Sequence, residues 1–496
     1  MLHTLLFVLY FTVLLILSGY GLHRSHLVLL CSRYGRRMKF LRRGPDRPLM
    51  QGSVPYVTIQ LPLYNEATVA SRLLQAVAKM EYPRDRLEIQ VLDDSTDETQ
   101  SIAKQEVERM RAGGLDAVYI RRPDRVGYKA GALDYGLKRA KGEFVAIFDA
   151  DFLPQPSFLS SIAGEFHDPT VGMVQARWGH MNRDHSLLTK VQALMLDGHH
   201  LVENRARFAA GRLFNFSGTG GMWRKQAIDE AGGWQHDTLT EDLDLSYRAQ
   251  LKGWRFVYRE DVMTPAELPE DVSALRAQQY RWAKGTVQTA RKLLGRVVRS
   301  HLTVAQRIEA LFHLTPHFAY PLMVLLSVLL LPALILSPAT DTWTMILIDL
   351  PLCIGTTGSL AIFYGVAESA QGRKSVWALW RLPALIALGV GMAPHLTKAV
   401  WDGLQSMSGE FVRTPKKGAR EGRYRAYASL PMTEMTLGLV SAFSVVASIQ
   451  TAHWFATPFA MMFTFGYGYV SALVIIEQTA RRRLMASQTA TVRVAG

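Results

Sequence analysis

Two clusters of aspartates follow apolar, β-branched runs in this chain. Asp93 and Asp94 lie in "RLEIQVLDDS", and Asp149 and Asp151 end "EFVAIFDAD" about fifty-five residues later. Two carboxylates at positions i and i+2, just past a buried strand, can share one hard cation. Mg²⁺ or Mn²⁺ is the expected ion, because both keep waters and take diphosphate oxygens as further ligands. A lone Asp-x-Asp carries little weight, but the second cluster favours a metal site that holds a diphosphate leaving group.

A lysine near these clusters suits a phosphate. "VGYKAGAL" places Lys129 at a glycine-flanked helix start. A lysine together with the free N–H groups of a helix N-terminus can bind a phosphate. An ordinary surface lysine at the head of a helix fits the same pattern.

A third acidic cluster could supply a general base. "TLTEDLDLSYRAQLKGW" predicts a helix that starts at Thr240, Glu241 and Asp242. Asp242 could deprotonate an acceptor hydroxyl at the mouth of a site. Asp244 fits equally well by spacing. A capping threonine followed by acidic residues that favour the helix dipole also explains the pattern.

A fourth segment combines an amide, a guanidinium and an indole. In "LRAQQYRWAKGTVQ", Gln278, Arg281 and Trp282 share one face of a helix. Such a face could bind a diphosphate and stack a sugar. An amphipathic helix lying on a membrane is the alternative, and spacing does not separate the two.

The elements that must position these side chains alternate between strands and helices over residues 55–295. Short strands are predicted in "YVTIQLPLYNE", "RLEIQVLDDS", "DAVYIRR", "EFVAIFDAD" and "VGMVQARW". This alternation predicts an open, mostly parallel sheet. Ligands bind such sheets at the carboxyl ends of the strands. The polar residues of the first, second and fourth of these strands should therefore meet at one edge.

Composition indicates two unlike parts. The 496 residues carry a net charge of +14 with a pI near 9.7, which is typical of proteins that bind nucleic acid, anionic lipid or a phosphorylated substrate. A hydrophobic fraction of 49% and a mean hydropathy of +0.05 are high for so charged a soluble chain. The two cysteines, Cys31 and Cys353, give neither a disulfide framework nor a metal signature.

Apolar stretches predict five membrane spans, near residues 5–22, 315–337, 343–367, 433–452 and 454–477. Arginines follow the first span, so the positive-inside rule places the N-terminus outside and the C-terminus in the cytoplasm. The apolar segment 377–404 contains Arg381, His395, Lys398 and Asp402. We interpret it as an interfacial helix, because a sixth span would put both later basic clusters outside.

The predicted organisation follows from these spans. An N-terminal transmembrane helix (1–31) precedes a cytoplasmic catalytic domain (50–295), then interfacial helices with two transmembrane helices (300–404). A cytoplasmic loop (405–430), two more transmembrane helices (431–480) and a cytoplasmic tail (481–496) complete the chain. The expected location is the cell (inner) membrane.

The motifs "DD", "DAD", "TED" and "QQYRW", in this order and followed by membrane helices, resemble those of processive family 2 glycosyltransferases, which include the bacterial cellulose synthase catalytic subunit. The segments "NFSGTGGMWRKQAIDEAGGW" and "ELPEDVSALRAQQYRW" are most similar to plant cellulose-synthase-like mannan and glucan synthases. The resemblance covers the whole catalytic domain. It implies a GT-A type α/β nucleotide-diphospho-sugar transferase domain joined to an α-helical transmembrane region.

The resemblance also implies a role for each motif. Asp242 is the expected base, Asp149 and Asp151 hold the metal and diphosphate, and Thr219 lies in a small-residue acceptor loop, "FSGTGG". The expected donor and acceptor contacts are Tyr64, Glu66 and Asp94 for the nucleoside, Lys129 for its phosphates, and Gln278, Arg281 and Trp282 for the diphosphate and the acceptor mouth.

The basic loop "FVRTPKKG" admits two interpretations. Alone it is a charged tether at the membrane surface. Processive synthases carry a similar Phe-x-x-Thr-x-Lys loop that enters the active site over bound nucleotide. The resemblance therefore implies a gating loop that closes over the donor through Phe411, Arg413, Thr414 and Lys416.

The expected function is an inverting, processive membrane β-glycan synthase that transfers hexose from UDP-glucose or GDP-mannose and is coupled to export. A single-transfer enzyme that glycosylates a ceramide or diacylglycerol is the alternative. A non-catalytic transporter or receptor would leave the four motifs unexplained. The expected partners are a nucleotide sugar, a growing glycan and the bilayer, with no nucleic acid, and accessory export proteins stay open.

Overall fold

The structure is a computed structural model that describes residues 2–42, 54–336, 357–407 and 430–495. Its strands are β1 Val57–Leu63, β2 Leu87–Asp93, β3 Asp116–Ile120, β4 Phe144–Ile147, β5 Val171–His180, β6 Gly221–Arg224 and β7 Arg255–Ala266. The α-helices up to residue 298 are α1 Leu2–Arg42, α2 Ala70–Ala78, α3 Thr99–Ala112, α4 Tyr128–Leu137, α5 Phe158–Ala163, α6 Leu187–Gly198, α7 Arg205–Ala209, α8 Lys225–Glu230, α9 Glu241–Leu251 and α10 Val272–Val298. The later helices are α11 Val304–Leu314, α12 Ala319–Leu336, α14 Ser359–Ala370, α15 Val376–Gln405, α16 Met432–Gln450 and α17 Thr457–Ala495. Short 3-10 turns at Arg84–Arg86, Gly164–His167 and Pro316–Phe318 and a π-helical turn at His199–Asn204 complete the described elements.

The seven described strands form one sheet in the order β3-β2-β1-β4-β6-β5-β7. The strands pair in parallel except for β6, which runs antiparallel between β4 and β5. All five predicted strands are present, so the predicted mostly parallel sheet is confirmed. The parallel register aligns Leu63 of β1 with Asp93 of β2, which brings the polar residues after both strands to one edge.

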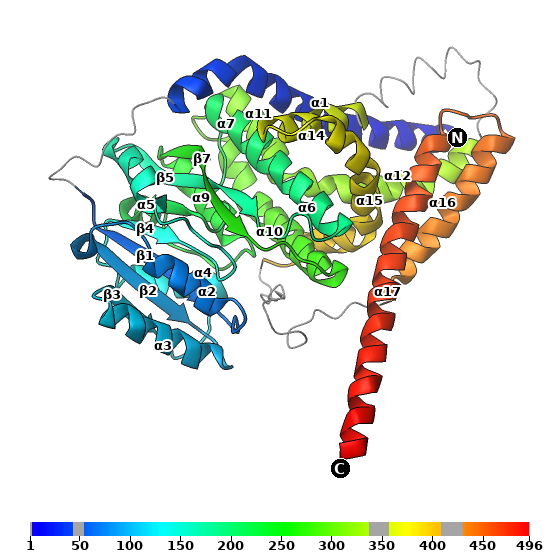
Figure 1. Cartoon of the computed structure of the whole chain (residues 1–496). Coiled ribbons are helices and arrows are strands. Elements are labelled where there is room, and N and C mark those ends of the chain that lie inside the picture. The colour runs from blue at the N-terminus through cyan, green and yellow to red at the C-terminus, as the bar shows by residue number, and fades with distance from the viewer. Residues whose placement is uncertain (1, 43–53, 337–356, 408–429, 496) are drawn as a thin grey trace.

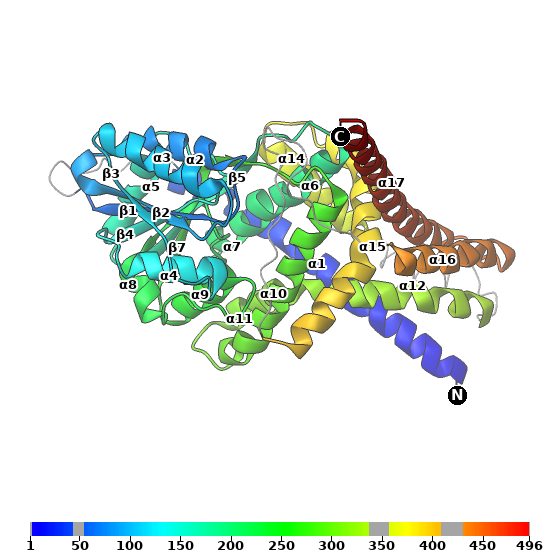
Figure 2. The same cartoon turned by 90° about the horizontal axis from the view of Figure 1, so that it is seen from below.

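Helices cover both faces of the sheet, as Figure 2 shows, with α2, α3 and α5 on one side and α4, α8 and α9 on the other. Leu73 and Val107 contribute to the apolar core of the first face, and Leu133, Ile228 and Leu245 to that of the second. β1 and β2 alternate apolar with polar residues although both faces are buried. The buried polar side chains pair with one another, because Thr58 donates to Glu88 at 2.7 Å and Gln60 donates to Gln90 at 3.1 Å.

The remaining helices lie to one side of this α/β domain (Figure 1). Helix α10, 27 residues long, lies between the two parts and packs against α9 and α15. Helix α15 in turn packs against α12, α14 and α17, and α1 runs along α7, α12 and α14. The α/β domain therefore contacts the apolar helices through α10, and also through α6 and α7, which pack against α14 and α1.

Within the described ranges, five helices are long and apolar enough to cross a membrane: Thr4–Gly35, Pro316–Leu336, Val376–Gln405, Met432–Gln450 and Thr457–Ala480. Four of them overlap predicted spans. The predicted span 343–367 falls partly outside the described residues, and its described part enters α14.

The segment predicted to be interfacial, 377–404, lies within one continuous helix, α15, although it contains Pro383 and Pro394. Two of its polar side chains, His395 and Asp402, pack on α10, and Arg381 forms an ion pair of 3.2 Å with Glu368 of α14. The His395 ring Nε2 lies 3.2 Å from the carbonyl oxygen of Arg276, and Tyr280 donates a hydrogen bond to Asp402. By length and composition α15 could also cross a membrane. Its interfacial position therefore stays a prediction, and so does the orientation of the N-terminus, which was inferred from the same topology.

Candidate active site

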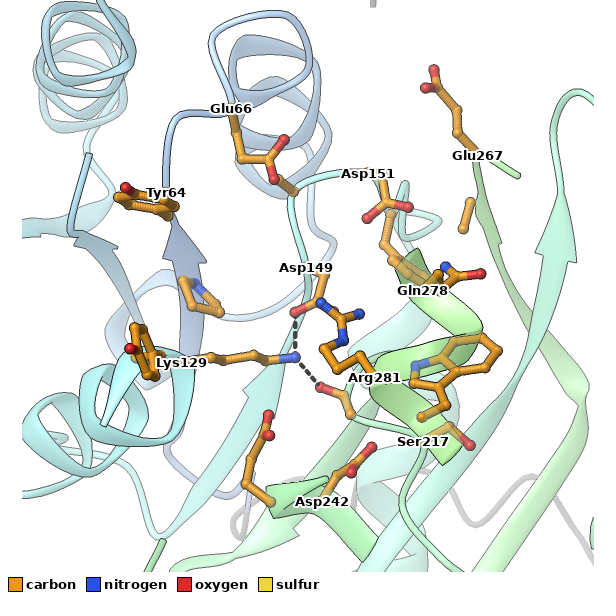
Figure 3. A pocket seen from close by; sticks show the side chains of 18 of the residues that line it. Tyr64, Glu66, Lys129, Asp149, Asp151, Ser217, Asp242, Glu267, Gln278 and Arg281 are labelled. Carbon is orange, nitrogen blue, oxygen red and sulfur yellow. Dashed lines mark hydrogen bonds and ion pairs between the residues drawn. The ribbon is translucent and has the colours of Figure 1, made fainter. Parts of the chain in front are cut away.

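A pocket opens at the carboxyl ends of β1, β2 and β4 and is closed on its far side by α9 and α10 (Figure 3). It collects residues from all four motifs. Ten of the predicted site residues line it: Tyr64, Glu66, Asp94, Lys129, Asp149, Asp151, Asp242, Gln278, Arg281 and Trp282. The fold thus brings together side chains that are more than two hundred residues apart in the sequence.

Lys129 lies at the centre of the pocket, in the first turn of α4. Its Nζ is 2.5 Å from Oδ1 of Asp149 and donates a hydrogen bond of 2.9 Å to the Gly218 carbonyl oxygen (Figure 3). Burial would lower the pKa of Lys129, but the carboxylates around it, led by Asp149 and Glu241, outweigh burial and raise it. The lysine is therefore a fixed positive charge, as phosphate binding requires.

Asp242 faces Lys129 across the Ser217–Gly218 loop. Gly218 has a φ of +82°, and a Cβ at this position would lie 2.9 Å from Oδ2 of Asp242 and 3.5 Å from Nζ of Lys129. Only glycine adopts this backbone and leaves this space. The loop therefore runs directly between the candidate base and the candidate phosphate-binding lysine.

The carboxyl group of Asp242 is poised to exchange a proton near neutral pH. Burial, reinforced by the negative charge of Glu241, raises the pKa of Asp242 to about 7, although Lys129 acts to lower it. Its Oδ1 accepts a hydrogen bond of 2.8 Å from the Leu243 backbone N–H. A pKa near the operating pH suits a general base.

The structure separates Asp242 from its competitor by position. Asp244 is fully buried, forms ion pairs of 2.7 Å with Arg248 and 3.0 Å with Lys292, and is absent from the pocket lining. Thr240 does not cap α9 with its side chain, and its Oγ1 lies 3.2 Å from that of Thr289 on α10. Capping therefore does not account for this motif.

Helix α10 presents Gln278, Arg281 and Trp282 to the pocket from one face, as predicted (Figure 3). Burial lowers the pKa of Arg281, although the carboxylates of Glu241 and Asp149 act to raise it. The amide, guanidinium and indole therefore lie together opposite the "DAD" carboxylates.

At the end of the pocket that is predicted to bind the nucleoside, Asp94 and Tyr64 contact two arginines that the sequence did not indicate. Both oxygens of Asp94 are held by Arg122, through Nε at 3.0 Å and Nη2 at 2.5 Å. The guanidinium carbon of Arg125 lies 3.3 Å from the centre of the Tyr64 ring. Sequence reasoning missed both arginines, although they directly precede "VGYKAGAL" in "RRPDR".

Two predicted groups differ from this pattern. Thr219 is 1% exposed, and its Oγ1 accepts a hydrogen bond of 2.9 Å from the backbone N–H of Asp149, so it supports the "DAD" turn from behind the pocket wall. Phe411, Arg413, Thr414 and Lys416 lie outside the described residues.

Trp178 and His180 at the end of β5 also line the pocket and were missed, because β5 ends in no carboxylate. Burial, followed by the charge of Arg183, lowers the pKa of His180 to about 3. The ring is therefore neutral at physiological pH. The His180 side chain is 3% exposed and lies 3.2 Å from Asp197, so of the two rings only the partly exposed Trp178 offers a surface on which a sugar can stack.

The "DAD" carboxylates fit a cation whose remaining ligands come from the diphosphate and from water. No group of three or more His, Cys, Asp or Glu side chains within the described ranges is placed to enclose a metal ion. Asp149 and Asp151 nevertheless line the same pocket. The carboxylates of Asp149 and Asp151 would hold Mg²⁺ or Mn²⁺, and diphosphate oxygens and waters would be its further ligands.

Comparison with known proteins agrees with this geometry. Residues 55–285 match the family described as "Glycosyltransferase like family 2". Glucomannan 4-beta-mannosyltransferase 1 of Oryza sativa subsp. japonica is 34% identical over 471 residues, which cover 88% of this chain and 89% of the relative. Glucomannan 4-beta-mannosyltransferase 2 of Arabidopsis thaliana is 44% identical over 270 residues, 53% of this chain and 51% of the relative.

A solved structure shares the fold. The mannosyltransferase PcManGT from Pyrobaculum calidifontis, in complex with GDP-Man and Mn²⁺, superposes with a TM-score of 0.52 and 23% identity, over 78% of this chain and all but 1% of that one. The GT-A like fold of the catalytic domain is therefore shared with a glycosyltransferase. The chain belongs to glycosyltransferase family 2, among the relatives of the cellulose-synthase-like plant glucomannan 4-β-mannosyltransferases, and is a transferase of sugar from a nucleotide sugar.

Proposed function

We propose that this protein is an inverting, processive β-mannosyl transferase that extends a glycan at the membrane with GDP-mannose as donor. The single observation that carries the proposal is the pocket in which Asp242 faces Lys129 and the "DAD" carboxylates. One base and one diphosphate site are what a direct displacement at the anomeric carbon requires. A direct displacement inverts the configuration and gives a β-linkage.

The side chains divide this reaction between them. Asp242 takes the proton from the attacking hydroxyl, and Trp282 and Gln278 hold the acceptor sugar at the mouth. Lys129 and Arg281 bind the diphosphate and stabilise the negative charge that it gains as it leaves. Mg²⁺ or Mn²⁺, held by Asp149 and Asp151, would neutralise further charge on the diphosphate when bound.

Mannose is the proposed sugar because the plant relatives are named 4-β-mannosyltransferases and the shared-fold structure holds GDP-Man. UDP-glucose is the competing donor. A polymer is the proposed product because the relatives are named for glucomannan, and the predicted gating loop, which lies outside the described residues, would favour repeated addition. Location in the cell membrane with a cytoplasmic pocket and coupling to export are parts of the same proposal.

The test supplies the full chain, in membranes or nanodiscs, with labelled GDP-mannose or UDP-glucose and Mg²⁺ or Mn²⁺. We expect label from GDP-mannose in an insoluble product that an endo-β-mannanase digests. Asp242→Asn should abolish incorporation while GDP still binds. Removing the divalent cation with a chelator should stop incorporation as well.

Two outcomes would contradict the proposal. Label that appears only in organic-soluble material would favour the single-transfer glycolipid enzyme. Incorporation from UDP-glucose alone would replace the proposed donor while leaving the transferase chemistry in place.

A further inference from the structure

The loop between β3 and α4 carries an arginine that no predicted role uses. We propose that Arg125 selects the base of the donor nucleotide, by pairing with the O6–N7 edge of a guanine that stacks on the ring of Tyr64. This inference rests on the GDP-linked donor proposed above and adds to it the residue that reads the base.

The position of Arg125 is the first observation. Its guanidinium carbon lies 3.3 Å from the centre of the Tyr64 ring and 4.8 Å from that of Tyr128. A distance of 3.3 Å is the separation of two stacked planar groups. Arg125 also lines the pocket, together with Tyr64 and Tyr128. It therefore covers the aromatic face on which a planar base would lie.

The bonding of Arg125 is the second observation. Within the described part of the chain, its guanidinium makes no ion pair with a carboxylate, and its contacts are the two tyrosine rings. The neighbouring Arg122, by contrast, is fixed by Asp94 and donates to the carbonyl oxygens of Val126 and Tyr128 at 2.8 and 3.0 Å. Arg122 thus fixes the loop, and the guanidinium N–H groups of Arg125 can donate hydrogen bonds to a ligand.

Backbone contacts in the loop fix the position of the Arg125 backbone beside the pocket. Val126 donates its N–H to Oδ1 of Asp124 at 3.1 Å, Gly127 has a φ of +74° and Tyr128 one of +49°. A Cβ on Gly131 would collide with the Val126 carbonyl oxygen. The backbone is therefore determined on both sides of Arg125, and only its side chain needs to move off the ring.

The chemistry of the base decides which nucleotide this arginine prefers. Guanine presents two acceptors, O6 and N7, whose spacing matches the paired donors of a guanidinium. Adenine presents one acceptor beside an amino donor, and uracil lacks the N7 acceptor. A planar base on Tyr64 brings its edge to the place where the displaced guanidinium lies. Arg125, which contacts the rings of Tyr64 and Tyr128, is thus placed to recognise guanine.

The test measures binding of GDP, IDP, 7-deaza-GDP, ADP and UDP, each with Mg²⁺, to the full chain in nanodiscs by calorimetry. We expect GDP and IDP, which share O6 and N7, to bind more tightly than the other three. Arg125→Ala should reduce the preference for GDP over UDP by about 5- to 150-fold, the range that one bidentate pair supplies. Arg125→Lys, which keeps the charge and loses the fork, should lose most of the same preference.

Arg121→Ala is the matched control. It removes an equal charge from the same loop at a residue that is exposed and does not line the pocket, and it should leave the preference unchanged. Thermal melts of each variant check that the loop remains folded.

The outcomes separate the two proposals. If the wild-type chain prefers UDP or binds GDP and UDP equally, the proposed donor is wrong and the guanine reader with it. If the wild-type chain prefers GDP and Arg125→Ala keeps that preference, or weakens all five nucleotides equally, the donor stands and the role of Arg125 is overturned.

Discussion

At the scale of residues, the pocket holds more carboxylates than cationic side chains, and Lys129 lies among those carboxylates. Lys129 is bonded to Asp149 and to the Gly218 carbonyl, and Asp242 lies on the other side of that glycine. A donor diphosphate that binds Lys129 must replace Asp149 as the partner of its ammonium group. Lys129 thus lies between Asp149, a candidate metal ligand, and Asp242, the candidate base.

The raised pKa of Asp242 leads to a pH prediction. Asp242 accepts a proton only when it is ionised, and its pKa of about 7 means that acid conditions remove the base. The value of kcat/KM should therefore fall about tenfold from pH 8 to pH 6, as the ionised fraction does. Initial rates across this range, with GDP binding measured in parallel as the control, check it. A flat profile would assign the base elsewhere.

Sequence alone identifies most of the candidate site, because its residues cluster in short motifs at strand and helix ends. It could not find Arg122 and Arg125, since their roles depend on which ring and which carboxylate the folded loop reaches. It could not place Thr219 either. A hydroxyl in a loop of small residues gives no sign of whether it faces the pocket or, as here, the backbone of Asp149.

At the scale of elements, two strands escaped prediction for a physical reason. β6 has only four residues, and β7 is interrupted by the charged residues Arg259, Glu260 and Asp261 and contains Pro265, so neither shows the alternating apolar pattern of β1 or β2. Both are held by their neighbours in the sheet rather than by local preference. Strands were predicted where the local sequence carries a run of β-branched and apolar residues, and were missed where pairing with neighbouring strands decides.

Helix α10 controls the position of the base through a glycine. A Cβ on Gly285 would lie 2.7 Å from Cγ2 of Thr240 and 2.8 Å from the backbone of Leu239 and Thr240. Gly285→Ala should therefore push the segment that carries Asp242 and lower kcat roughly 100-fold, the cost of about 1 Å of misplacement. Steady-state kinetics with GDP-mannose checks it.

Gly295→Ala is the control on the same helix, because a Cβ there meets no atom within 4 Å. It should preserve kcat and raise thermal stability slightly, as alanine favours a helix over glycine. Equal kinetics for the two variants would show that α10 does not set the position of Asp242.

At the scale of the whole molecule, the helical part depends on close approach between α15 and α17. A Cβ on Gly391 would collide with the Gly466 carbonyl oxygen, and one on Gly466 would lie 2.6 Å from Cγ1 of Val390. Small residues at such crossings let helix backbones meet. Gly391→Val should destabilise the chain by about 1–3 kcal/mol through overpacking.

The measurement is the fraction of protein that remains monodisperse after heating in detergent. Gly389→Ala, two residues away on the same helix with no atom within 4 Å of the added Cβ, serves as the control. A Gly391→Val variant that survives heating as well as Gly389→Ala would argue against a tight crossing in solution.

The contacts at two glycines link the candidate base, Asp242, to helices that could span a membrane. A Cβ on Gly403 of α15 would lie 2.9 Å from the Lys284 carbonyl oxygen of α10, and the next residue, Gly285, is the one that meets Thr240. Helix α15 is itself held between α10 and the candidate spans α12 and α17. A tilt of α15 would therefore be passed through two backbone contacts to Asp242. We therefore expect the rate of sugar transfer to depend on bilayer thickness and lateral pressure, and hence on lipid composition.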